Sequence, residues 1–195
     1  MSIKKIGLFF GSFNPIHVGH LIIANHLVSD ADLDEVWLIV SPHNPLKEKK
    51  SLANDYDRLC MVELALGDNS KIKASNIEFA LPKPSFTIDT LIFLKEKYPS
   101  KSFVLLMGGD NLASFDKWKN YEMILQEHEI YVYARPGSEM VVPDKFSEHK
   151  IRFINAPMLE ISSTYIRERI KVGNSIRYLV PDAVYKYIHD HRIYQ

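Results

Sequence analysis

The segment Gly11-Ser12-Phe13-Asn14-Pro15-Ile16-His17-Val18-Gly19-His20 decides how this chain folds, because it joins two patterns of different periodicity. Residues 6–10 before it (Ile-Gly-Leu-Phe-Phe) are nearly all apolar and predict a short buried strand. After it, Leu21, Ala24 and Val28 recur at helical spacing. We therefore predict that residues 11–20, called the first turn below, connect a strand to a helix. Such a turn lies at the carboxyl end of a strand, where α/β proteins bind ligands.

The composition of the first turn favours an anionic ligand. A helix that begins there offers free backbone N–H groups and the positive end of its dipole. His17 and His20 are three positions apart, so they would project from one helix face toward the same point. The residues alone leave two other interpretations open, an ordinary turn with a solvated face or half of a metal site. The metal interpretation is weaker, because no cysteine or acidic residue lies nearby at zinc-like spacing.

The bulk composition is that of a globular protein without a charge preference. The chain has 195 residues, 46% of them apolar, and we expect a single domain over residues 1–195 with a real core. Lys plus Arg and Asp plus Glu number 24 each, which argues against a nucleic-acid or membrane partner. The one cysteine excludes an internal disulfide, and no signal-like or membrane-spanning segment is evident. These features predict a cytoplasmic protein.

Strand-like and helix-like patterns alternate along the rest of the chain. Further strands are predicted at residues 36–40, 103–107, 130–133 and 151–154, with weaker signals at 71–74 and 77–79. Helices are predicted at residues 55–66, 87–97, near 117–126, from about Ser163, and after Pro181. The alternation predicts an α/β three-layer sandwich, in which a mainly parallel sheet carries helices on both faces and the C-terminus is helical.

The first turn resembles the first signature of the adenylyltransferases in the nucleotidyltransferase superfamily. The residues that carry the resemblance are Gly-Ser-Phe-Asn-Pro-Ile-His-x-Gly-His, whose second half is a variant of the HIGH motif. The resemblance implies a Rossmann-like fold, with His17 and His20 facing the phosphates of ATP. Nicotinate-mononucleotide and pantetheine-phosphate adenylyltransferases share the signature, so it indicates the superfamily rather than the substrate.

A second motif with a phosphate-binding character follows near the end of the chain. Ser162 and Ser163 suit the start of a helix as ordinary caps, but we expect Arg167 in the first helical turn, where a cation opposes the helix dipole. A bound anion would reverse that penalty. The stretch Ile161-Ser162-Ser163-Thr164-Tyr165-Ile166-Arg167 resembles the family's Ile-Ser-Ser-Thr-x-Ile-Arg motif, which binds ATP phosphates opposite the first turn.

The loop after the second predicted strand lies at the same edge of the sheet. Its residues, Ser41-Pro42-His43-Asn44-Pro45-Leu46-Lys47, fit a solvated loop about as well as a functional one. In the adenylyltransferases a proline-rich loop here carries a histidine and a lysine. Lys47 matches that lysine, which would supply a mobile positive charge to the triphosphate.

Four further matches indicate the nicotinate-mononucleotide branch. Pro84-Ser85-Phe86-Thr87 resembles its Pro-Ser-Tyr-Thr motif, and we also expect Ser85 or Thr87 to cap a helix there. Gly108-Gly109-Asp110 matches a Gly-x-Asp whose carboxylate binds ribose hydroxyls, although Asp110 could also cap a turn. Trp118 matches a tryptophan that packs on the nicotinate ring, although an isolated tryptophan is more often core. Arg135 matches the family's Arg-Pro-Gly, whose arginine approaches the mononucleotide.

The resemblance covers nearly the whole chain and implies transfer of AMP from ATP to nicotinate mononucleotide, giving deamido-NAD and pyrophosphate. The catalytic residues that it implies are His17, His20, Lys47 and Arg167. The ATP-binding residues that it implies are Gly11, Ser12, Phe13, His17, Gly19, His20, Gly108, Asp110, Ile161, Ser162, Ser163 and Arg167. The mononucleotide-binding residues are Ser85, Phe86, Thr87, Asp110, Trp118 and Arg135. Mg²⁺ would be held mainly by the phosphates, without a dedicated protein site.

Three residues depart from the branch's pattern. Phe86 and Lys119 stand where tyrosine is common, and Ala134 stands where many members have a second basic residue. The alternatives are a pantetheine-phosphate adenylyltransferase, a non-catalytic nucleotide-binding module, and a fragment of a tRNA-binding synthetase. Trp118 and the Pro-Ser-Phe-Thr segment argue against the first, and the retained histidines against the second. The balanced charge argues against the third.

Overall fold

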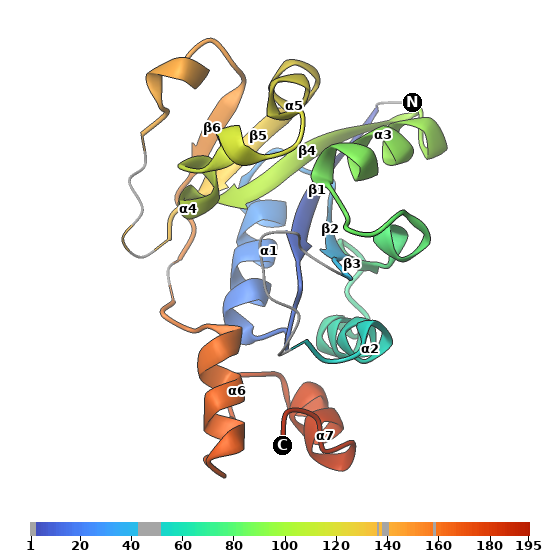
Figure 1. The fold of residues 1–195 in the computed structure, drawn as a ribbon, viewed down its shortest axis with the longest axis vertical. Coiled ribbons are helices and arrows are strands. Elements are labelled where there is room, and N and C mark those ends of the chain that lie inside the picture. The colour runs from blue at the N-terminus through green and yellow to red at the C-terminus, as the bar shows by residue number, and fades with distance from the viewer. Residues whose placement is uncertain (1–2, 43–51, 136, 138–140, 158) are drawn as a thin grey trace.

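A parallel sheet of six strands forms the centre of the computed structural model, which describes residues 3–42, 52–135, 137, 141–157 and 159–195 (Figure 1). The strand order is β3-β2-β1-β4-β5-β6, and every pairing is parallel. The strands are β1 (Lys4–Gly11), β2 (Glu35–Val40), β3 (Ile72–Ser75), β4 (Lys101–Gly108), β5 (Glu129–Tyr133) and β6 (Ile151–Ile154). The order reverses between β1 and β4, so the crevice at their carboxyl ends is the place where such sheets bind ligands.

Helices cover both faces of the sheet, as the alternating sequence predicted. The α-helices are α1 (Val18–Asp30), α2 (Asp55–Leu66), α3 (Thr87–Lys97), α4 (Gly109–Leu112), α5 (Tyr121–Glu127), α6 (Ser163–Lys171) and α7 (Asp182–Asp190). Short 3₁₀ helices are η2 (Ile77–Ala80), η3 (Phe115–Lys117) and η4 (Asp144–Phe146).

The core has two parts because successive strand residues face opposite sides of the sheet. Phe9 belongs to the cluster that buries residues of α1, α2, α6 and α7, whereas its neighbour Leu8 belongs to the cluster with α3 and α5. Strands buried on both faces read as continuous apolar runs, which is why the short run at residues 6–10 was a reliable strand signal.

Two predicted elements differ from the structure. Residues 77–79 form part of the 3₁₀ helix η2 rather than a strand, because the chain turns directly after the edge strand β3, and the Phe79 N–H donates to the Asn76 carbonyl (2.9 Å). The helix predicted near residues 117–126 begins later, at Tyr121, and the 3₁₀ turn η3 precedes it. None of the helices in the described part of the chain is long and apolar enough to cross a membrane.

Candidate active site

The first turn leads from the end of β1 into α1, and the starts of α4 and α6 lie at the same edge of the sheet. In Figure 1, α6 lies beside the end of β1 from which α1 begins. The Ser163 hydroxyl on α6 donates to the Pro15 carbonyl of the first turn (2.9 Å), which fixes that proximity. The N-termini of α1 and α6 therefore lie close together, and their free N–H groups favour an anion there.

The structure brings His17 and His20 into direct contact. His17 is the N-cap of α1, and its ring stacks on the His20 ring with centroids 3.7 Å apart and planes 29° apart. The His20 Nδ1 accepts from the His17 backbone N–H (3.3 Å), so His20 helps to satisfy the start of the helix. A Cβ at Gly19 would lie 3.1 Å from the His17 ring, so a larger residue there would have to displace that ring by a few tenths of an ångström.

His17 is neutral at physiological pH. The residue is only 5% exposed. This burial and the positive charge of Arg135 lower the pKa of the His17 imidazole to about 4. Its buried Nδ1 has no hydrogen-bond partner among the described residues. A neutral imidazole with a free nitrogen can donate to a phosphate oxygen from one tautomer without bringing a permanent charge.

The backbone of the first turn is held from beneath by Arg58 of α2, which sequence reasoning missed. This arginine is 0% exposed, and its guanidinium donates to the carbonyls of Ser12 (2.6 Å), Ser41 (2.8 Å) and Ala53 (3.1 Å). It also pairs with Asp55 (2.6 Å). One buried cation thus ties the first turn to the loop after β2 and to the start of α2. The sequence did hold a signal for this burial, because Arg58 lies three and four positions before the core residues Met61 and Val62 and so shares their face of the helix.

The Ser-Ser-Thr segment starts α6 beside the first turn. Ser162 is the N-cap, and its hydroxyl accepts from the Tyr165 N–H (3.1 Å), as an ordinary cap does. Arg167 is the fifth residue of α6, so the prediction that it lies within the opening helical turn of α6 was wrong. Its Nη1 donates to the Asn14 carbonyl (2.9 Å), which places the guanidinium at the first turn. Ile161 is half-buried and packs against the core.

Phe13 and Gly11 shape the first turn from within. Phe13 is 1% exposed and its ring meets the His20 ring edge-on, with centroids 5.1 Å apart, so its side chain supports the histidine rather than lining open space. Its backbone is in the left-handed region (φ 43°), where a side chain of this size is strained. A Cβ at Gly11 would come within 2.8 Å of the Phe13 ring, so glycine is required for this packing.

The segment matched to mononucleotide binding lies at the start of α3. Phe86 is the N-cap of that helix and no side chain caps it, so the prediction of a cap by Ser85 or Thr87 was wrong. The Lys119 amino group lies over the Phe86 ring (4.7 Å to the centroid) and pairs with Asp89 of α3 (2.9 Å). Lys119, a departure from the family pattern, therefore ties the segment after Trp118 to α3.

Asp110 and Arg135 lie at the ends of β4 and β5. Asp110 is exposed in α4, and its Oδ1 is 3.9 Å from the Arg135 Nε. Arg135 also donates to the Tyr133 hydroxyl (3.3 Å). A Cβ at Gly108 would clash with the Asp110 carboxylate and lie 2.8 Å from the Arg135 side chain, so a larger residue where β4 ends would displace these two side chains.

Two buried polar atoms of the candidate site are unpaired. In the part of the chain that the structure describes, the buried Trp118 Nε1 and His17 Nδ1 lack hydrogen-bond partners. Leaving a buried polar atom unpaired costs roughly 1–3 kcal/mol, so such atoms in a native structure call for an explanation. Both atoms belong to residues that the sequence motifs had assigned to substrate binding, and a bound polar ligand would pair them.

Glu78 is a buried carboxyl that the sequence did not single out. It is 2% exposed and accepts from the Thr90 hydroxyl of α3 (2.8 Å). Burial raises its pKa, although the neighbouring hydroxyls of Thr90, Ser41 and Ser85 act in the opposite direction. The carboxyl thus lies between the loop after β2 and the segment before α3.

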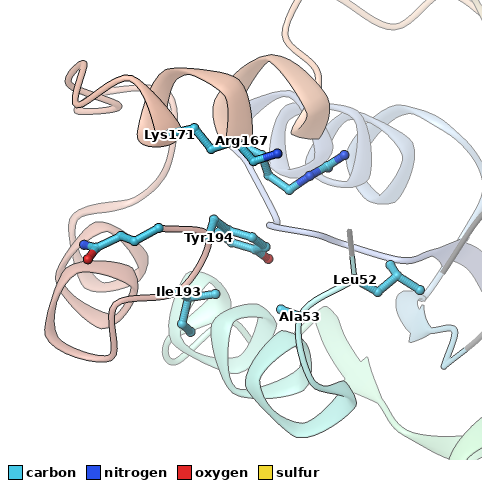
Figure 2. Close-up of a pocket in the computed structure, with 7 residues that line it drawn as sticks. Leu52, Ala53, Arg167, Lys171, Ile193 and Tyr194 are labelled. Atoms are coloured by element: carbon cyan, nitrogen blue, oxygen red, sulfur yellow. The ribbon is translucent and has the colours of Figure 1, made fainter. Parts of the chain in front are cut away.

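A cavity of about 270 Å³ lies on the other side of Arg167 (Figure 2). Its lining residues are Leu52, Ala53, Arg167, Lys171, Ile193, Tyr194 and Gln195. Figure 2 shows Tyr194 between α6 and the segment that contains Ala53. Lys47, predicted to contact the triphosphate, lies outside the described residues.

The chain matches proteins of one enzyme class over nearly its full length. Residues 8–169 match the cytidylyltransferase-like family model. A probable nicotinate-nucleotide adenylyltransferase of Flavobacterium psychrophilum is 54% identical, with 98% of this chain and 99% of that protein covered. A similarly named protein of Bacteroides fragilis is 46% identical, with 96% and 92% covered. The fold resembles Plasmodium falciparum nicotinic acid mononucleotide adenylyltransferase complexed with NaAD, with a TM-score of 0.82, 22% identity, and 98% and 97% of the two chains covered.

Proposed function

Because the chain belongs to the cytidylyltransferase-like family and, within it, to the nicotinate-nucleotide adenylyltransferases, we propose that it transfers AMP from ATP to nicotinate mononucleotide. The products are deamido-NAD and pyrophosphate. The observation that carries the proposal is the stacked pair His17 and His20 at the start of α1, with Arg167 held at the same turn. Such a site binds phosphates and needs no covalent intermediate.

The reaction is a direct displacement at the α-phosphorus of ATP. An oxygen of the mononucleotide phosphate forms the new P–O bond, the bond to the bridging oxygen of the β-phosphate breaks, and its electron pair leaves with pyrophosphate. The attacking phosphate is already anionic at neutral pH, so no general base is required. Catalysis then consists of alignment and of stabilising charge on the transferring and leaving groups.

The residues of the first turn suit that task. Neutral His17 donates a hydrogen bond to the phosphates, and His20, stacked on it, presents a second imidazole to them. Arg167, with Lys47, offsets the charge of the β- and γ-phosphates. We infer that Mg²⁺ enters with ATP and would be held by phosphate oxygens and water, because this ion dehydrates reluctantly and is usually bound through substrate phosphates. When bound, the ion supplies further charge neutralisation.

The mononucleotide occupies the region between α3 and the end of β4 in this proposal. The Trp118 ring, together with Phe86, provides a flat apolar surface for the pyridine ring, and the Ser85 hydroxyl donates to its polar substituent. Asp110, exposed at the start of α4, accepts from the ribose hydroxyls, and Arg135 beside it faces the phosphate. We also expect the enzyme to act in the cytoplasm.

The test is a comparison of substrates with the purified full-length chain. The protein is incubated with ATP, MgCl₂ and nicotinate mononucleotide, nicotinamide mononucleotide or phosphopantetheine, and both the adenylylated product and pyrophosphate are measured. The proposal predicts the highest kcat/KM for nicotinate mononucleotide. A higher value for nicotinamide mononucleotide would overturn the acid-form assignment, and turnover of phosphopantetheine alone would overturn the branch. ATP binding without pyrophosphate release would indicate a non-catalytic module.

A further inference from the structure

A tyrosine that follows α7 reaches back to the first turn. The Tyr194 hydroxyl donates to the Asn14 Oδ1 at 2.8 Å, across a sequence separation of 180 residues. The phenol is largely enclosed, and burial raises its pKa despite the nearby charges of Arg58 and Arg167. The hydroxyl therefore keeps its proton and remains a donor at any physiological pH.

Asn14 collects contacts from three separate parts of the chain. Its Oδ1 accepts from Tyr194 and also from the Ala53 backbone N–H (3.0 Å). Its backbone carbonyl accepts from Arg167 Nη1 (2.9 Å). Asn14 is itself only 2% exposed and lies three residues before His17. The position of Asn14 thus fixes the backbone that leads into α1, and it also fixes where Arg167 lies relative to that backbone.

The backbone around Tyr194 adopts a costly conformation. Tyr194 and Arg192 both lie in the left-handed region, with φ values of 70° and 51°, where residues other than glycine are uncommon. Such strain persists only where surrounding contacts determine the conformation, and it is concentrated at functional positions. Here the contact that the strained backbone makes possible is the hydrogen bond to Asn14.

We propose that Tyr194 is a positioning residue for adenylyl transfer, which acts through Asn14 to hold His17 and Arg167 in register around the phosphates. The inference rests on the proposed function, because the geometry that it fixes is that of the phosphate site. Tyr194 does not touch the mononucleotide region in this scheme. Its loss should therefore reduce turnover rather than mononucleotide binding.

The experiment compares Tyr194→Phe with the wild-type enzyme. Removing the hydroxyl leaves the ring in place and deletes one hydrogen bond of the network, so we expect kcat to fall about tenfold. The KM for nicotinate mononucleotide should stay within about twofold. Amide hydrogen exchange at residues 11–17 should become faster, whereas exchange in β4 should not change.

Tyr187→Phe is the matched control. The Tyr187 hydroxyl donates to the Asp57 Oδ1 (2.9 Å), so it also joins the C-terminal region to an earlier element, but to α2 rather than to the first turn. We expect both variants to lose a similar amount of thermal stability, and only Tyr194→Phe to lose turnover. Equal losses of kcat in the two variants would mean that general loosening of the C-terminal region is responsible, and would overturn the proposal.

A double-mutant cycle with Asn14→Ala tests the route of the effect. If Tyr194 acts through Asn14, adding Tyr194→Phe to Asn14→Ala should change kcat by less than about twofold. If Tyr194→Phe lowers kcat tenfold both in the wild-type background and in the Asn14→Ala background, the effect does not pass through Asn14, and the inference is overturned. If Tyr194→Phe fails to fold while Tyr187→Phe folds, the role of Tyr194 is purely structural, and the inference is also overturned. If the wild-type protein forms no dinucleotide, the proposed function is refuted. If the wild-type protein is active and Tyr194→Phe has the same kcat, only the inference about Tyr194 is refuted.

Discussion

Replacement of His17 by asparagine should remove a defined part of the acid sensitivity of folding. Burial and Arg135 lower the His17 pKa from 6.5 to about 4. The native protein therefore binds fewer protons than the unfolded chain between these pH values. As pH falls through this window, the free energy of unfolding must decrease, because protons favour the unfolded state. The pKa difference corresponds to a loss of about 3 kcal/mol once the pH is below 4.

The assay is urea unfolding of the wild type and His17→Asn at pH 7, 6, 5 and 4. Carboxylates contribute to the pH dependence of both proteins, so the informative quantity is the difference between their two curves. We expect that difference to change by about 3 kcal/mol over the range, with the wild type losing more. Replacement of His189, which is exposed, by asparagine serves as the control for replacing a histidine outside the site.

Direct titration of His17 by NMR provides the second measurement. A midpoint below about 5 is expected, since the ring has little access to water and a guanidinium nearby. Parallel unfolding curves for wild type and His17→Asn, or a midpoint near 6.5, would refute the reasoning. The imidazole would then be available as a cation at the phosphates, and the neutral-donor role would have to be abandoned.

Three further predictions follow from contacts in the structure. His20→Ala should lower kcat by at least about 10²-fold, as expected for loss of a transition-state donor, with the modest loss of Tm that follows from losing one hydrogen bond at the start of α1; near-normal turnover in the folded variant would remove His20 from the mechanism. Arg58→Met should destabilise the fold by about 3 kcal/mol or more in urea titrations, because the carbonyls of Ser12 and Ser41 lose a buried donor; a change below 1 kcal/mol would show that water replaces it. Although burial raises the pKa of Glu35, hydrogen bonds from Lys73, Trp37 and Lys4 lower it to about 2, so its contribution to stability is present above pH 4.5 and lost toward pH 2. Glu35→Gln should thus cost about 2 kcal/mol at pH 7 and little at pH 2, and an equal cost at both values would contradict this account.

Local patterns predicted most of the fold. Helices α2 and α3 begin and end at the predicted residues, because the apolar spacing of each runs unbroken between clear boundaries. The all-parallel sheet followed from the alternation of strands and helices. The 3₁₀ helix η2 (Ile77–Ala80) was missed because the short apolar run at residues 77–79 fits a strand and a buried turn equally well.

The candidate site could be predicted only where its residues are close in sequence. His17 and His20 share one helix start, so their contact follows from spacing alone. Arg58, Glu78 and Tyr194 act through partners that are far away in the sequence, and no local pattern indicates such pairs. The cap at α3 was mispredicted for the same reason, since tertiary surroundings rather than local preference position Ser85 and Thr87.

The distance in sequence between the first turn and its supports has a consequence for how the enzyme is made. Asn14 is synthesised early, but Arg167 and Tyr194, which hold it, follow 153 and 180 residues later. At about 5–20 residues per second, a ribosome takes roughly 10–40 s to supply them. During that interval the histidines exist in a chain whose first turn has its early partners Ala53 and Arg58 but not Arg167 and Tyr194. A nascent or truncated chain is therefore expected to turn over no ATP, and activity should arise only when the last helices have docked.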